Sequence, residues 1–147
     1  MWARKIFFGL CMIFISHVGY ADETSFDAHK CNSVKDEVLS FMNTWIKPIV
    51  LYKNQGGTEP EINDALISQL IKREKLLSKC ARDQFLSNNY KSDDTGPNYS
   101  LASIHILGLN VGLEHAITAK KSGLFNKYIK RWDVDYSYKS ILNSLGK

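Results

Sequence analysis

The sequence lacks the patterns that mark most enzymes and nucleic-acid-binding proteins. It contains no Gly-x-Ser-x-Gly elbow, no phosphate-binding glycine loop, no Cys-x-x-Cys pair and no constellation of paired carboxylates. It also has little excess charge, since 19 Lys and Arg oppose 15 Asp and Glu, whereas nucleic-acid-binding domains usually gather a larger basic excess on one face. We therefore expect neither an enzyme nor a nucleic-acid-binding protein, and we expect no cofactor.

No apolar run is long enough for a membrane-spanning helix, which needs about 20 residues. The longest run, residues 6–18, follows the basic pair Arg4 and Lys5 and ends at the small-residue exit Gly19-Tyr20-Ala21. This order is typical of a cleavable secretion signal. We expect residues 1–21 to be removed and residues 22–147 to form one domain without a transmembrane segment. The expected location is the periplasm or, alternatively, the extracellular space.

Cysteine is scarce, and its distribution becomes informative once the signal is removed. Cys11 lies within the apolar run, which leaves Cys31 and Cys80, and an even pair in an exported chain predicts a disulfide. Cys31 precedes Asn54 by 23 residues and Cys80 follows Glu59 by 21. At a rise of about 1.5 Å per residue, two antiparallel helices would bring the cysteines level with each other.

Apolar residues recur every three or four positions and predict helices throughout the domain. We expect a first helix over residues 25–54, which Pro48 kinks or breaks. Thr58, Pro60 and Glu61 form a capping signal for a second helix that ends near Ser87. This second helix is apolar over more than half its circumference, which favours packing against two neighbours.

A third helix is expected over residues 99–121, mostly buried by its composition, followed by two short helices. No segment alternates with the period of a strand. The sequence therefore predicts an all-α fold, a small antiparallel bundle of about four to five helices with one disulfide. Gly108, Gly112 and Ala116 recur at four-residue spacing in the third helix, which favours tight internal packing over a dimer seam; a homodimer stays open.

Polar residues in apolar surroundings are the first candidates for a binding site. Gln69 and Arg73 fall inside the apolar arc of the second helix. Because buried polar groups need partners, Arg73 either pairs internally with a carboxylate or faces a protein partner, where arginine beside apolar surface is common.

Two further segments are candidates for partner binding. Residues 88–98 form a polar, turn-rich connection with Tyr90, Asp93 and Asp94; calcium is rejected there because Ile104 occupies the position that needs a glutamate. Near the C-terminus Phe125, Tyr128 and Trp132 share a helical stripe, which favours packing. The basic residues around this stripe either are simply exposed to solvent or contact a partner. They are Lys127, Lys130 and Arg131.

The histidines supply little chemistry. None has a metal-ligand spacing to another histidine or to a cysteine, so no metal site is expected. His105, Glu114 and His115 are the only conceivable catalytic centre, but neighbouring helical side chains such as Glu114 and His115 diverge by about 100°.

In class, the signal, the Cys31 and Cys80 pair and the helical pattern resemble two groups of periplasmic proteins. One comprises helical immunity proteins that neutralise cell-wall-degrading effectors, including type VI amidase effectors; the other comprises small acid-stress chaperones. The first resemblance implies a protein inhibitor that plugs an enzyme's cleft with a loop or helix end, for which residues 88–98 are the candidate. A stress chaperone, or an accessory subunit of an envelope or secretion assembly, is the alternative.

Overall fold

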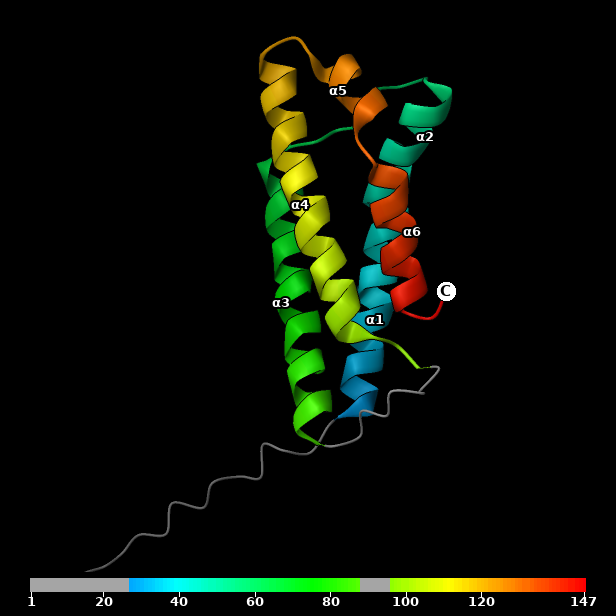
Figure 1. Cartoon of the computed structure of the whole chain (residues 1–147), viewed down its shortest axis with the longest axis vertical. Helices are drawn as coiled ribbons and strands as arrows, with labels where there is room; N and C mark the ends of the chain where they lie inside the picture. The colour runs from blue at the N-terminus through cyan, green and yellow to red at the C-terminus, as the bar shows by residue number, and fades with distance from the viewer. Residues whose placement is uncertain (1–26, 88–95) are drawn as a thin grey trace, which may run out of the picture.

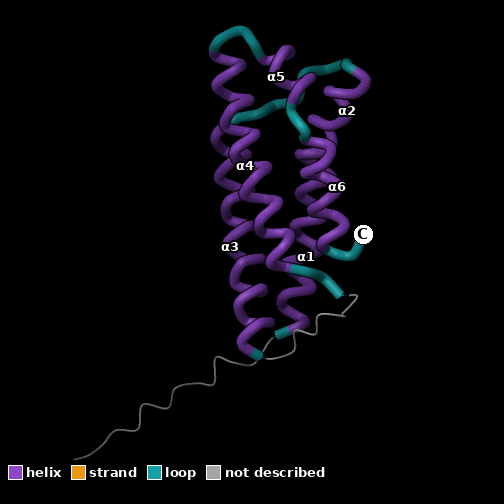
Figure 2. Tube along the Cα trace, in the orientation of Figure 1, coloured by secondary structure: helices purple, strands orange, loops and turns teal. Residues whose placement is uncertain are grey.

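The computed structural model describes residues 27–87 and 96–147, which form helices and no strand (Figures 1 and 2). Five helical rods make up this part, so the predicted all-α bundle of four to five helices is confirmed. The predicted signal at residues 1–21 and the candidate residues Tyr90, Asp93 and Asp94 lie outside the described residues. The helices, in chain order, are α1 (Ala28–Phe41), η1 (Met42–Ile46), α2 (Lys47–Gln55), α3 (Asp64–Leu86), α4 (Tyr99–Lys121), α5 (Phe125–Arg131) and α6 (Val134–Ser144).

The first rod consists of α1, η1 and α2, and its irregular part lies just before Pro48. Here η1 is a π-helix, in which the backbone N–H of Lys47 donates to the carbonyl of Met42. Pro48 occupies the first turn of α2, where its missing N–H costs nothing. The predicted disturbance is therefore confirmed, and the helix resumes after it as far as Gln55, close to the predicted end at residue 54.

The second rod starts later than predicted. We expected Thr58 as its cap, but α3 begins at Asp64 with Asn63 as N-cap, whose side chain accepts a hydrogen bond from the Leu66 N–H at 2.9 Å. Asn63 also donates to Glu61 at 2.7 Å, so Glu61 orients the cap instead of completing a box with Thr58. The connection before it is extended and tied to α4 by the Lys120–Glu59 ion pair at 2.8 Å.

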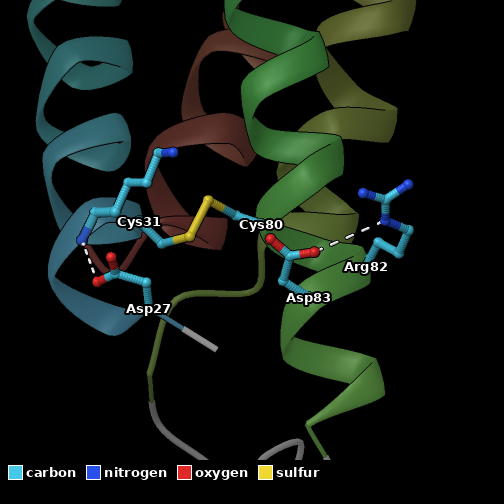
Figure 3. Close-up of a disulfide and its surroundings, with 6 residues drawn as sticks. Asp27, Cys31, Cys80, Arg82 and Asp83 are labelled. Carbon is cyan, nitrogen blue, oxygen red and sulfur yellow. Dashed lines mark hydrogen bonds and ion pairs between the residues drawn. A yellow bond between two sulfur atoms is a disulfide. The ribbon is translucent and has the colours of Figure 1, made fainter. Parts of the chain in front are cut away.

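The disulfide joins Cys31 of α1 to Cys80 of α3, with 5.8 Å between the Cα atoms (Figure 3). Both cysteines are buried. The prediction from their level positions on antiparallel helices is therefore confirmed. Close by, the Asp27 side chain caps α1 by accepting from the Lys30 N–H at 3.0 Å, and Asp83 pairs with Arg82 at 3.7 Å (Figure 3).

The two long helices are buried less completely than predicted. Helix α3 does pack against both α1 and α4, but Phe85 near its end is 72% exposed. Helix α4, expected to be mostly buried, contacts α3, α5 and α6 with one face only and leaves the opposite face to solvent. The prediction of a mostly buried helix rested on its apolar composition. A helix is buried all round only when other helices surround it, and in this bundle they pack against one side of α4.

The small-residue series of α4 divides between two environments. Gly112 is covered by Trp132, whose indole occupies the space that a Cβ would need, and the Tyr128 hydroxyl donates to its carbonyl at 2.9 Å. Gly108 has nothing within 4 Å of a built Cβ. Internal packing is thus confirmed at Gly112 and wrong at Gly108.

The C-terminal segments complete the core. Phe125 is buried, and Tyr128 and Trp132 are partly buried against the core, so packing is confirmed for the aromatic stripe. The end of α6 returns to the start of α4, where the Asn98 N–H donates to the Ser144 carbonyl at 2.7 Å. No helix within residues 27–87 and 96–147 combines the length and the apolar character needed to cross a membrane.

Candidate arginine and aromatic groove

A groove of about 350 Å³ opens between the first rod and the start of α3. We call it the Arg73 groove. Phe41 and Trp45 contribute from the α1–η1 junction, while Leu66 and Arg73 contribute from α3. The groove is more apolar than polar in its lining. Its remaining lining residues are Glu61, Asn63, Ala65 and Gln69.

Arg73 is held firmly in this groove by neighbours on two helices. Its Nη1 donates to the carbonyl and to Oε1 of Gln69 at 2.9 and 3.0 Å, and its Nη2 lies 3.2 Å from Glu37 Oε1. The guanidinium carbon lies 4.3 Å from the centre of the Phe41 ring, a cation–π contact. The Arg73 side chain is only 15% exposed, so its charge is fixed in place along the groove wall.

The internal ion pair, one of the two alternatives predicted for Arg73, is therefore present. Because Glu37 neutralises the charge from α1, the guanidinium can lie beside apolar surface without remaining an unpaired buried cation. The Nε atom is buried and has no hydrogen-bond acceptor among the described residues. Arg73 thus both joins α1 to α3 and lines a concave surface.

Trp45 owes its exposure to the π-helix. In an uninterrupted α-helix its position would lie within the stripe of Val34 and Val38, at about 100° per residue. The i→i+5 bonding of η1 fits an extra residue into the turn. As a result Ile46 is fully buried while Trp45 is 50% exposed at the groove edge. Sequence patterns did not single out Phe41 or Trp45 as groove residues; the disturbance predicted at Pro48 was the available signal.

The other candidate residues are placed elsewhere. Lys127, Lys130 and Arg131 are exposed on α5, and Lys130 lines a separate hollow with Tyr52 of α2. The structure does not bring this basic rim into the Arg73 groove, with which that hollow shares no lining residue.

The conceivable catalytic residues do not converge on a common cleft. The His105 ring packs against Tyr136 at 5.9 Å, and the His115 ring packs against Tyr128 at 6.3 Å between centroids. Glu114 is exposed and lies 3.5 Å from the Asn110 amide. Within the described part of the chain, no three His, Cys, Asp or Glu side chains are grouped so that they could hold a metal ion.

The clearest electrostatic feature outside the groove is Asp135 of α6. Lys53 Nζ lies 3.2 Å from its Oδ1, and the Asn54 amide donates to its Oδ2 at 3.1 Å. Burial raises the pKa of Asp135, but the hydrogen bonds from Asn54 and Lys53 and the charge of Lys53 outweigh that effect and leave the pKa lowered. This cluster fastens the end of α2 to α6.

No protein-family model, no curated protein and no solved structure matches the chain.

Proposed function

We propose that this chain is an exported binding protein that inhibits a partner enzyme in the bacterial envelope, as an immunity protein does. The Arg73 groove is the observation that carries the proposal. Protein interfaces draw most of their binding energy from a few tryptophan, tyrosine and arginine side chains in or beside pockets. A half-exposed Trp45 next to a prepositioned Arg73 has this composition.

The groove is suited to an apolar side chain of the partner. Phe41, Ala65 and Leu66 offer apolar walls, and Trp45 can close over an inserted group because half of its surface is free. Arg73 is already ordered by Glu37 and Gln69, so docking costs little side-chain entropy there. Tyr90, Asp93 and Asp94, which lie outside the described residues, remain proposed contacts of the same inhibitor, as do Lys127, Lys130 and Arg131.

Export is part of this proposal. The order of residues at positions 1–21 supports a signal, and a buried Cys31–Cys80 disulfide suits an oxidising compartment such as the periplasm. A helical domain held by this bridge keeps its groove preformed, which favours tight inhibition.

Coexpression with the product of the neighbouring reading frame tests the function. That product is exported to the periplasm of a test bacterium, with and without the present chain, and lysis is followed by optical density. We expect the chain to prevent lysis and Trp45→Ala to weaken complex formation by about tenfold or more, as hot-spot truncations do. Leu51→Ala, an exposed apolar residue of α2 outside the groove, should bind like the wild type.

Two results would count against the proposal in different ways. A wild-type chain that neither binds nor protects would remove the inhibitor function for that pair. Full binding by Trp45→Ala, alongside protection by the wild type, would keep the function and remove the groove from it.

A further inference from the structure

The solvent side of α4 is an apolar surface, and Glu114 is the first charged residue along the helix. Leu101, Ile104, Leu107 and Val111 are each at least 41% exposed, and Ile104 reaches 60%. They lie on the side of the helix opposite its buried residues. No Asp, Glu, Lys or Arg occurs from Tyr99 through Leu113, so this surface lacks the charged residues that usually keep an exposed helix face apart from other proteins.

Neighbouring helices extend this surface on both sides. Figure 1 shows α4 between α3 and α6, and both pack against it. Phe85 of α3 lines a hollow together with Arg82 of α3 and Ser100 of α4, and Tyr136 of α6 contacts His105. We call the whole surface the α4 face; its large apolar members are Phe85, Leu101, Ile104, Leu107, Val111 and Tyr136.

The size of the α4 face is that of a protein interface. From Leu101 to His115 the helix is about 21 Å long. With a helix packed on either side at about 8–10 Å, the face spans roughly 20 Å in each direction. The flat area is then roughly 400 Å², and the accessible surface of the protruding side chains adds to it towards the roughly 800 Å² that each partner contributes to a standard interface.

Its centre permits close approach of another helix. Gly108 lies midway between Leu101 and His115, on the exposed side, with open space where a side chain would stand. A helix that crosses there can approach more closely than over any larger residue, while Ile104 and Val111 pack on either side of the crossing point.

We propose that the chain forms a two-fold homodimer through the α4 face, with the two α4 helices antiparallel and crossing at Gly108. A second copy supplies an occupant of the right length that is equally apolar, so no charge on either central surface is desolvated. The position of Glu114 near one end of the face decides how the two α4 helices are oriented. A parallel pair would set the exposed Glu114 against its own copy, whereas the antiparallel pair separates the two carboxylates by about 18 Å along the axis.

Sedimentation velocity across micromolar concentrations is the primary test. The mature wild-type chain should sediment as a dimer, and Ile104→Glu should raise the dissociation constant at least tenfold, because the dimer would bury two unpaired carboxylates. Leu124→Glu places the same charge on an exposed apolar residue between α4 and α5, outside the face, and should leave the dimer intact. Circular dichroism of each variant checks that the monomer fold is kept.

Crosslinking tests the geometry. Gly108→Cys should give a covalent dimer rapidly on mild oxidation because the two-fold axis brings that position next to itself, whereas Leu101→Cys should react slowly because its antiparallel counterpart lies near His115. Rapid crosslinking at both positions would overturn the antiparallel arrangement. A wild-type chain that stays monomeric, or an Ile104→Glu variant that dimerises equally well, would overturn the dimer itself.

The test of the homodimer can be distinguished from the test of the proposed inhibitor function. Trp45→Ala should leave sedimentation unchanged because Trp45 lies outside the α4 face. If the wild type is monomeric and Ile104→Glu instead loses the partner enzyme, the face belongs to that partner and the homodimer is wrong.

Discussion

At the scale of single residues, two glycines of α4 show how position along one helix decides the role of a side chain. Gly112 and Gly108 are one turn apart, but the first lies beneath the Trp132 indole and the second faces open space. Gly112 therefore serves the packing of the C-terminal segment onto α4. Gly108 leaves a gap on the outer surface of the helix.

Replacing each glycine by alanine should give opposite results. Gly112→Ala places a methyl group into the Trp132 ring, and overpacking of this kind costs about 1–3 kcal/mol of unfolding free energy. Gly108→Ala meets no clash and should stabilise an isolated monomer by up to about 1 kcal/mol through helix propensity. Urea unfolding at high dilution measures both changes. Equal effects of the two substitutions would show that the Trp132 packing does not constrain Gly112.

Arg73 shows what residue patterns could and could not foretell about the site. Its place among the apolar residues of α3 predicted either an internal carboxylate partner or a protein partner, and Glu37 provides the first. The groove around it could not be predicted, because it depends on how far η1 rotates Trp45 out of the helical stripe. Pro48 indicates that the helix is disturbed but not in which direction the side chains before it turn.

At the scale of helices, the sequence was most informative where one face differs clearly from the other. The recurrence of apolar residues every three or four positions predicted the first helix, and its members Cys31, Val34 and Val38 are all buried. Helix α4 carries apolar residues around most of its circumference, so its pattern could not indicate which side meets the bundle. Only the positions of α3 and α6 settle that Leu109 is buried and Val111 is exposed.

The disulfide is the covalent link between α1 and α3, and its removal should be costly. It closes a loop with a sequence separation of 49, for which the chain-entropy estimate gives about 4 kcal/mol. The double substitution Cys31→Ala and Cys80→Ala should lower the unfolding free energy by about this amount in urea titrations. Wild-type protein unfolded with a reductant should match the double variant, since both lack the bridge. An unchanged midpoint after removal of both cysteines would mean that the unfolded chain is not restricted by the bridge.

At the scale of the whole molecule, α6 closes the bundle at both of its ends. Near its start Asp135 pairs with Lys53 of α2, and near its end Ser144 accepts from Asn98. Tyr138 in between donates to Asn43 of η1 at 2.7 Å. Helix α6 thus ties the first rod to α4, so loss of its contacts should loosen parts of the chain far apart in sequence.

The contact between α6 and α2 at Asp135 should make the stability of the protein depend on pH. Its pKa is lowered in the folded protein by Asn54 and Lys53 against the effect of burial, whereas an unfolded aspartate titrates near 3.9. Folding therefore favours the ionised form of Asp135. The stability that this group contributes is fully present above about pH 4 and is lost as the pH falls through the lowered pKa.

The unfolding free energies of wild type and Asp135→Asn should differ by a constant amount from neutral to mildly acid pH, and this difference should shrink at lower pH. Asp133→Asn, an exposed position two residues earlier, controls for the loss of one negative charge. A difference that persists unchanged in strong acid would contradict the role of the Asp135 carboxylate.

The same pH series separates the inhibitor from the acid-stress chaperone. Loss of tertiary structure well above pH 4, with Asp135 still ionised, would favour the chaperone, because such a chaperone exposes its apolar core on acidification. An inhibitor must instead keep its groove formed.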